Sequence, residues 1–260
     1  MKCKICSGKA TAIFSALVLQ KYTANYFFCN HCGYLQIEDP CWLEESYDST
    51  VSIEDTGLVK RNLLFSKRSS VIINFLFNKN GRFLDYAGGY GIFVRLMRDS
   101  GFDFYWSDPF TQNLIARGFE YTGEERIELL TAFECFEHFS DPIKEIETML
   151  NISKNILFST RIFKGTPPDP DQWWYYYLNT GQHISFYSEK TLQFIAKKNN
   201  IFLNTNHKSF HLFSTKKLSN VYFNFLLGLS QLGMVNVLKL GLKSKTDMDF
   251  SLLTSRGKNI

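Results

Sequence analysis

The segment Leu84–Gly91, with the sequence LDYAGGYG, constrains the fold of this 260-residue chain more than any other. An apolar run ends there at an acid, Asp85, and passes directly into three glycines within four positions. Parallel sheets bind ligands beyond the carboxyl ends of their strands, and glycines let the backbone approach a ligand closely. The segment therefore predicts a strand of a parallel sheet that ends at a binding site.

Strands and helices alternate from this segment onward. We expect strands at 82–86, 103–107, 127–133 and 155–160, followed by a hairpin of strands 201–206 and 210–214. We expect helices over Ile92–Ser100, from Asp141-Pro142 onward, and over Ser188–Asn199. This alternation predicts an α/β fold with helices on both faces of the sheet.

Two C-x-x-C pairs stand in front of this region. Each pair can wrap a tight knuckle around one ion, and two knuckles complete a tetrahedral thiolate set for zinc; the four cysteines are Cys3, Cys6, Cys29 and Cys32. A redox C-x-x-C or unconnected thiols would not explain the doubling. The pairs predict a structural zinc ribbon, with His31 as an exposed knuckle residue. We interpret Cys41 and Cys135, which have no partner at ligand spacing, as small apolar residues.

Charge and the amino terminus narrow the partners and the compartment. The formal net charge is only +4, and no long block of Lys and Arg occurs, which argues against a dedicated nucleic-acid surface. Lys2 and Cys3 follow Met1 without the apolar core of a secretory signal. We therefore expect a cytoplasmic protein whose partner is a small-molecule substrate.

Two acids, one strand apart, suggest the ligand. A carboxylate at Asp85 would repel a pyrophosphate but can pair with the ammonium of an amino acid. Asp108, 23 positions on, follows the next strand and can accept hydrogen bonds from ribose hydroxyls. The third glycine of a dinucleotide fingerprint is replaced by Val94. The pattern favours S-adenosylmethionine, with a nicotinamide dinucleotide or a turn without a ligand as alternatives.

This segment resembles the class I S-adenosylmethionine-dependent methyltransferases. The acid and alternating small residues of that family fall here on Asp85, Ala87, Gly89 and Gly91, with Ala87 in place of the usual first glycine. Residues 131–142 (TAFECFEHFSDP) and 181–188 (GQHISFYS) are also similar to that family. With the cysteine pairs, the chain to about residue 215 resembles zinc-ribbon methyltransferases associated with sugar and surface-polysaccharide modification. The resemblance implies a Rossmann-like methyltransferase sheet and a cofactor site that includes Asp108 and Glu134.

The residues after the third strand are the first candidates for catalysis. Methyl transfer needs positioning and the removal of one proton, and His138 can serve as the general base, with Glu137 beside it. His183 is an equal candidate, because it lies before a capped helix in a loop expected to cover the site. A polar rim at a helix start is the alternative interpretation of these residues. The spacing E-x-x-E-H also resembles the segment that binds a divalent ion in ubiquinone-pathway O-methyltransferases, which implies Mg²⁺ at Glu134, Glu137 and His138.

The organisation that we expect has four parts. They are a zinc ribbon (1–40), a helical connector (41–80), an S-adenosylmethionine-binding domain (81–217) and a C-terminal helical tail (218–260). The ring-rich segment 167–177 either stacks on an acceptor or forms a hydrophobic cluster. The apolar run 221–242 predicts helices that pack on the protein or on a second copy in a homodimer. Attachment of the tail to the inner face of the membrane is the alternative.

Together these features predict methyl transfer to a small hydroxylated acceptor, a sugar linked to a nucleotide or a lipid. Three alternatives stay open at this point. They are an RNA methyltransferase with a zinc module, a nicotinamide-dependent oxidoreductase, and a non-catalytic binding protein on the same fold.

Overall fold

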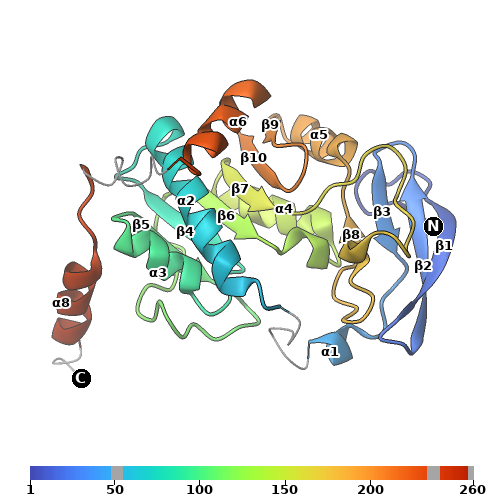
Figure 1. The fold of residues 1–260 in the computed structure, drawn as a ribbon, viewed down its shortest axis with the longest axis horizontal. Helices are drawn as coiled ribbons and strands as arrows, with labels where there is room; N and C mark the ends of the chain where they lie inside the picture. The colour runs from blue at the N-terminus through green and yellow to red at the C-terminus, as the bar shows by residue number, and fades with distance from the viewer. Residues whose placement is uncertain (48–54, 233–240, 257–260) are drawn as a thin grey trace.

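The computed structural model describes residues 1–47, 55–232 and 241–256 and contains two sheets (Figure 1). The larger sheet has six strands in the order β5-β4-β6-β7-β10-β9. Their bounds are β4 Arg82–Tyr86, β5 Asp103–Ser107, β6 Ile127–Phe133, β7 Ile156–Ser159, β9 Phe202–Thr205 and β10 Phe210–Ser214. The first four strands are parallel, and β10 pairs antiparallel with both β7 and β9. The predicted parallel sheet and its closing hairpin are therefore confirmed.

Helices cover both faces of this sheet. One face carries α2 (Leu58–Leu76), α3 (Ile92–Asp99) and α6 (Asn220–Leu229), whose apolar side chains share one buried cluster (Figure 1). The other face carries α4 (Pro142–Ile152) and α5 (Glu189–Lys198), which share a second buried cluster with the cysteine pairs. The α/β class with helices on both faces is confirmed.

The two predicted helix starts on the second face are formed by side-chain caps. The carboxylate of Asp141 accepts from the backbone N–H of Lys144, with Pro142 at the first position of α4. Ser188 and Thr191 form a reciprocal capping box at the start of α5. These caps fix where each helix begins, and hence where the preceding loops end.

The smaller sheet belongs mainly to the amino-terminal region. It has the order β1-β2-β3-β8, with bounds β1 Thr11–Val18, β2 Tyr22–Cys29, β3 Tyr34–Ile37 and β8 Ser185–Phe186. Short β8 comes from far along the chain and pairs antiparallel with β3. The hydroxyls of Tyr34 and Ser185 lie 2.6 Å apart across this pair. The ribbon region is therefore joined by backbone pairing to the segment that directly follows His183.

The ring-rich segment 167–177 packs mostly against this smaller sheet. Tyr175 and Tyr176 are buried, and Tyr176 contacts the rings of Phe14, Tyr26 and Phe186. The 3-10 turn η2 (Trp174–Tyr176) holds these rings in place. The structure thus favours the hydrophobic-cluster interpretation of the segment over stacking on an acceptor.

The carboxyl-terminal region contributes two described helices. α6 packs on α2, and α8 (Thr246–Arg256) lies apart from it, beyond the edge strand β5 (Figure 1). Part of the apolar run 221–242 falls on residues 233–240, outside the described residues. Among the residues that are described, no helix is long and apolar enough to cross a membrane. The homodimer, the membrane attachment and the four-part division stay predictions.

Candidate active site

The glycine loop follows β4, where the sequence placed it. Gly88 lies against the Trp106 indole, and an added Cβ would come within 2.7 Å of the indole Cδ1 atom. Gly91 has φ +85° at the start of α3, and an added Cβ would lie 2.7 Å from the Asn113 side-chain oxygen. Gly89, by contrast, faces open space, since no described atom lies within 4 Å of its Cβ position. Protein atoms therefore pack against the loop at Gly88 and Gly91, whereas the loop is open at Gly89.

Asp85 lies in the middle of a row that runs across three strands. Trp106 of β5 and Thr131 of β6 are its register partners on either side. The Thr131 hydroxyl oxygen lies 2.6 Å from Oδ1 of Asp85. Oδ2 lies beside Gly88 and has no hydrogen-bond partner among the residues that the structure describes. One carboxylate oxygen is therefore held by the sheet, and the other is available to a ligand.

Burial controls the ionisation of Asp85. The residue is 4% exposed. Desolvation raises the pKa of its carboxyl group from 3.8 to about 7, against the Thr131 hydrogen bond, which lowers it. A buried carboxylate with one unbonded oxygen is stabilised by a cation, and an ammonium group would supply that charge.

Asp108 holds the same loop from the end of the next strand. Its Oδ2 accepts from the backbone N–H of Gly89 at 2.9 Å, and its Oδ1 accepts from Phe110 and Thr111. An ionised carboxylate has about four acceptor positions, so three are used and one remains for a hydroxyl. The structure thus adds to the predicted ribose contact a second role, the positioning of the glycine loop.

Two residues of the predicted cofactor set have unusual backbone conformations. Ala87 has φ +57° and Glu134 has φ +53°, both in the left-handed region that favours glycine. Each directly follows a strand, Ala87 after β4 and Glu134 after β6. The family's glycine at the position of Ala87 is explained by this conformation, and strain of this kind concentrates at functional sites.

Glu137, His138 and His183 form one buried group, called here the acid–histidine cluster. Glu137 and His138 lie on the 3-10 turn η1 (Phe136–His138) after β6, and His183 lies in the loop before β8. The two imidazole rings meet edge to face with centroids 5.0 Å apart. One potential ligand atom from each of the three residues lies within 4.8 Å of the other two. The structure therefore brings both candidate histidines together.

Hydrogen bonds define which ring nitrogens are free. Nδ1 of His138 lies 3.1 Å from the Gln182 carbonyl oxygen, and Nδ1 of His183 lies 2.7 Å from that of Tyr175. The Tyr47 hydroxyl oxygen also lies 3.0 Å from Nδ1 of His138. In the tautomer that bonds both carbonyl oxygens, each Nδ1 carries the hydrogen and each Nε2 has a lone pair. Burial lowers the pKa of His138 to about 4 and that of His183 to about 3. Both rings are neutral in the free protein at pH 7.

Glu137, the acid of this cluster, is 1% exposed. Desolvation raises the pKa of its carboxyl group to about 8, and the charge of Glu134 adds to the rise, against the side chains of Tyr175 and Thr160, which lower it. Its Oε2 has no hydrogen-bond partner among the described residues. An unsatisfied buried oxygen of this kind is costly unless a ligand completes it.

Glu134 does not belong to the acid–histidine cluster. Its carboxylate accepts a short hydrogen bond from the Ser159 hydroxyl, and its Oε2 lies 3.8 Å from Nε of Arg61. The potential metal ligands that the structure groups together are Glu137, His138 and His183, with His183 where the E-x-x-E-H resemblance implies Glu134. The implied Mg²⁺ set of Glu134, Glu137 and His138 is therefore not the set that the structure assembles.

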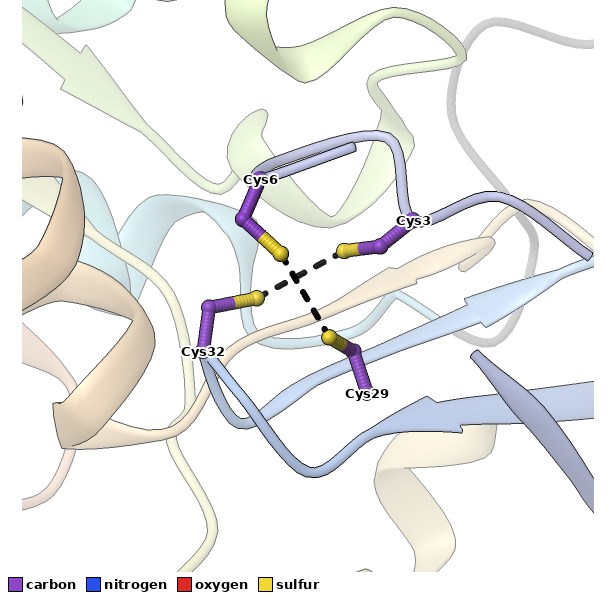
Figure 2. Close-up of side chains that lie close together, drawn as sticks. All are labelled: Cys3, Cys6, Cys29 and Cys32. Atoms are coloured by element: carbon purple, nitrogen blue, oxygen red, sulfur yellow. Dashed lines mark hydrogen bonds between the residues drawn. The ribbon is translucent and has the colours of Figure 1, made fainter. Parts of the chain in front are cut away.

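The four cysteines of the two pairs converge on one point (Figure 2). The sulfur atoms of Cys3 and Cys32, and those of Cys6 and Cys29, are 3.5 Å apart, and all four lie within 4.8 Å of one another. A separation of 3.5 Å between two sulfur atoms is too long for a disulfide. Tetrahedral zinc with Zn–S bonds of about 2.3 Å requires sulfur separations of about 3.8 Å. The four thiols therefore fit a zinc ion. His31 is exposed as predicted and Cys135 is buried, but Cys41 is exposed and is not a core residue.

A hollow of about 440 Å³ lies between the ribbon and the larger domain. It is lined by Phe28 and Asn30 of the ribbon and by the segments that follow β7 and β8, which include Phe163, Lys164 and Lys190. Neither the glycine loop nor Glu137, His138 or His183 lines this hollow.

A parallel sheet with a bare glycine loop, a buried acid and a second acid on the next strand defines a Rossmann-like methyltransferase fold. Residues 63–201, just over half of the chain, match the model of a family described as a methyltransferase domain, and the chain belongs to this family. It is an S-adenosylmethionine-dependent methyltransferase. Family membership sets aside the oxidoreductase and the non-catalytic alternatives.

Solved structures of similar fold include three methyltransferases. Magnesium protoporphyrin IX methyltransferase from Synechocystis PCC 6803, with bound SAH, is 12% identical over 66% of this chain and 92% of its own, with a TM-score of 0.41. An O-methyltransferase family protein from Burkholderia thailandensis is 13% identical over 68% of each chain, with a TM-score of 0.45. Human N-acetylserotonin methyltransferase with SAM is 12% identical over 68% of this chain and 67% of its own, with a TM-score of 0.42. No curated protein sequence matches the chain.

Sequence reasoning missed four residues of this site. Thr131 and Trp106 flank Asp85, Gly88 packs on the Trp106 ring, and Arg61 on α2 reaches Glu134. The position of Thr131 on a predicted strand was known, but its pairing with Asp85 depends on strand order and register. No local signal in the sequence carries that information.

Proposed function

We propose that this methyltransferase methylates a hydroxyl group of a small acceptor, a sugar carried by a nucleotide or a lipid. The observation that carries the proposal is the acid–histidine cluster. Its residues Glu137 and His138 follow β6, which is the strand that pairs with the Asp85 strand β4. It offers two imidazole lone pairs and one carboxyl group in a buried setting, which suits the removal of a hydroxyl proton.

The cofactor would lie against the glycine loop. Asp85 would hold its ammonium group through Oδ2, and Asp108 would accept from a ribose hydroxyl while it fixes the loop. Gly89 leaves open space that a side chain would fill, and the N–H groups of the first turn of α3, which have no partner within the helix, suit an anionic or polar ligand group. S-adenosylmethionine supplies a methyl group on a sulfonium centre. Ala87, Gly89 and Glu134 complete the proposed cofactor set.

The acceptor would lie on the side of the acid–histidine cluster. Nε2 of His138 or of His183 would accept the proton of the hydroxyl group as the oxygen forms its bond to the methyl carbon, while the bond between that carbon and the sulfonium sulfur breaks and S-adenosylhomocysteine leaves. Burial keeps both rings neutral, which is the form that accepts a proton. The carboxyl group of Glu137, which is protonated at pH 7 because its pKa is about 8, would orient the hydroxyl group through a hydrogen bond.

The hollow beside the ribbon supports a phosphate-bearing acceptor. Lys164 and Lys190 line it together with the rings of Phe28 and Phe163. Ammonium groups attract a diphosphate, and aromatic faces pack against sugars and bases. A nucleotide or lipid diphosphate in this hollow would hold the sugar toward the segments that carry Thr160 and His183.

The remaining parts of the proposal concern structure and location. Zinc at Cys3, Cys6, Cys29 and Cys32 would be structural, because four thiolates leave no open position. We place the enzyme in the cytoplasm, with attachment of the tail to the inner face of the membrane as an additional proposal.

The test is methyl transfer from radiolabelled S-adenosylmethionine to a panel of nucleotide-linked sugars, with the product identified by mass spectrometry. We expect label in a sugar hydroxyl and its loss in both His138→Ala and His183→Ala, while both variants still bind S-adenosylhomocysteine. Label found only in RNA, with binding that weakens steeply with salt, would establish the RNA methyltransferase alternative instead.

A further inference from the structure

The acid–histidine cluster has the composition of a metal site with an open position. It combines two imidazole nitrogens and one carboxylate, which are ligands of zinc and of other divalent transition metals. One ligand atom from each of Glu137, His138 and His183 lies within 4.8 Å of the other two. The three residues come from two segments that are far apart in the sequence, and the Ile184 N–H joins them by donating to the Glu137 carbonyl oxygen at 2.9 Å.

Both histidines are oriented as metal-binding histidines usually are. Such a residue donates the hydrogen of its second ring nitrogen to a backbone carbonyl or a carboxylate, which fixes the ring and the tautomer. Here Nδ1 of His183 lies 2.7 Å from the Tyr175 carbonyl oxygen, and Nδ1 of His138 lies 3.1 Å from the Gln182 carbonyl oxygen and 3.0 Å from the Tyr47 hydroxyl oxygen. With the hydrogen on Nδ1, each ring has its lone pair on Nε2, and the rings meet edge to face.

Glu137 supplies an independent observation that points to a ligand. The residue is 1% exposed, and its Oε2 has no hydrogen-bond partner among the described residues. Two imidazole lone pairs and this oxygen place three electron-rich atoms around one point. Leaving a buried acceptor unsatisfied is costly, and more so for a charged group. A cation at this point would satisfy all three atoms.

We propose that Glu137, His138 and His183 bind one divalent transition-metal ion through one carboxylate oxygen and two Nε2 atoms. Imidazole nitrogens favour Zn²⁺, Fe²⁺ or Mn²⁺ over Mg²⁺, which prefers oxygen ligands and retains its waters. Three protein ligands leave a fourth position for a water or for a hydroxyl oxygen of the acceptor. That use of the ion depends on the proposed function, whereas the binding of the ion does not.

The site differs in chemistry from the four-cysteine site, and cobalt distinguishes the two. The purified protein, with zinc in the ribbon, is titrated with CoCl₂ and followed by visible absorption and calorimetry. We expect one saturable equivalent with the d–d bands of cobalt bound to nitrogen and oxygen. The thiolate-to-cobalt charge-transfer band of a cysteine site should be absent.

Substitutions assign the ligands. His183→Ala and Glu137→Gln should each weaken cobalt binding by more than the roughly 10- to 100-fold that loss of an outer-shell partner costs. His31→Ala is the matched control, because this exposed histidine lies between two cysteines and should leave the second equivalent unchanged. Binding of S-adenosylhomocysteine verifies that each variant is folded. His138→Gln replaces any variant that fails this check.

The outcomes separate this inference from the proposed function. Folded protein that binds no cobalt, binds it equally in all variants, or shows only the thiolate band overturns the metal site. Cobalt binding without methylation of any sugar supports the metal site and removes the proposed function. Sugar methylation by protein that binds no cobalt supports the proposed function and overturns the metal site.

Discussion

Asp85 shows how a functional residue can oppose stability. Its carboxyl group has a pKa of about 7 in the folded protein and an ordinary value of 3.8. Folding therefore favours the neutral acid, so the contribution of Asp85 to stability is full below pH 4 and is lost as the pH rises through 7. Between these limits, the ionised side chain comes to cost at most about 4 kcal/mol.

Asp85→Asn should consequently stabilise the cofactor-free protein at high pH. The difference in free energy of unfolding between variant and wild type should grow from pH 4 to pH 7 and then level off. Urea unfolding at several pH values measures it. A difference that is flat across this range, or largest at pH 4, would show that Asp85 is not buried as an acid.

Ala87 tests the strain in the glycine loop. A left-handed conformation costs an L-residue about 1–2 kcal/mol, which glycine avoids. Glycine also makes the unfolded chain more flexible, which lowers stability by about 0.4–1 kcal/mol. Ala87→Gly should therefore raise the free energy of unfolding by about 0.5–1 kcal/mol. Ala132→Gly, in the buried strand β6, is the control and should destabilise. Equal destabilisation by both changes would contradict the left-handed conformation of Ala87.

At this scale the sequence predicted the residues whose chemistry is local. Asp85 and Asp108 each end an apolar strand, and strand ends are visible in the pattern of apolar residues. The hydrogen bonds of Asp108 to Phe110 and Thr111 and the partner hydroxyl of Thr131 were not predicted. The first depend on the shape of a loop, and the last depends on the register between strands.

Among the elements, β8 joins the four-cysteine region to the segment that carries His183. Gln36 of β3 pairs with Ser185, two positions after His183, and the Ile37 N–H donates to the Ile184 carbonyl oxygen. Gly33 in the second cysteine knuckle also packs against the Ser188 hydroxyl, where a Cβ would lie 2.3 Å away. The ribbon thus holds the segment that carries His183 from two sides.

Loss of zinc should therefore reduce methyl transfer more than cofactor binding. A displacement of about 1 Å at a catalytic group costs about 100-fold in rate, so Cys32→Ser should lower the rate by about that factor. Calorimetry should show that S-adenosylhomocysteine still binds, because the glycine loop lies on the other sheet. Cys41→Ser is the control, since Cys41 is exposed and lies outside the four-cysteine site. Full activity without zinc would contradict the link.

Element boundaries were predicted closely where the signal was strong. The strands 82–86, 103–107, 127–133 and 210–214 are the same in the structure, and capped helix starts fall at Asp141 and Ser188. The strand β8 was not predicted, because two residues carry no periodicity. Its pairing with β3 joins positions about 150 residues apart. A short strand of this kind is stabilised by its contacts with the partner strand, and its own sequence does not show those contacts.

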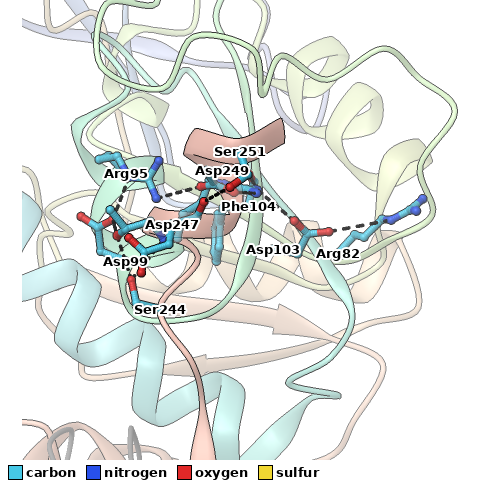
Figure 3. A network of polar contacts seen from close by, with 11 residues as sticks. Arg82, Arg95, Asp99, Asp103, Phe104, Ser244, Asp247, Asp249 and Ser251 are labelled. Atoms are coloured by element: carbon cyan, nitrogen blue, oxygen red, sulfur yellow. Dashed lines mark hydrogen bonds and ion pairs between the residues drawn. The ribbon is translucent and has the colours of Figure 1, made fainter. Parts of the chain in front are cut away.

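At the scale of the whole molecule, α8 is attached at the edge of the larger sheet. Arg98, at the end of α3, makes two hydrogen bonds to Asp249 at 2.7 and 2.8 Å, and both residues are 2% exposed. Arg95 of the same helix also donates to Asp249, at 2.9 Å (Figure 3). Arg98 also bonds Asp103 and lies 3.6 Å from the centroid of the Phe119 ring. The carboxyl-terminal helix is therefore attached to the helix that begins at the glycine loop through the ion pairs of Asp249 with Arg98 and Arg95.

Asp249→Asn should destabilise the protein, because it leaves buried Arg98 with only the partly exposed Asp103 as counterion and also removes the ion pair with Arg95. The expected loss is about 3–5 kcal/mol in the free energy of unfolding. Asp247→Asn, two positions earlier on the same helix and exposed, should have no measurable effect. Chemical denaturation of both variants distinguishes the two cases, and an equal effect would mean that α8 does not dock on Arg98.

The central claim is that the two acids and the glycine loop bind S-adenosylmethionine. Calorimetric titration of the zinc-loaded protein with S-adenosylhomocysteine at pH 8 tests it most directly. We predict one site in the wild type, and a loss of at least about 2 kcal/mol, or roughly 30-fold in affinity, for Asp85→Asn and for Asp108→Ala. Binding that is unchanged in both folded variants, or absent from the wild type, would contradict the account.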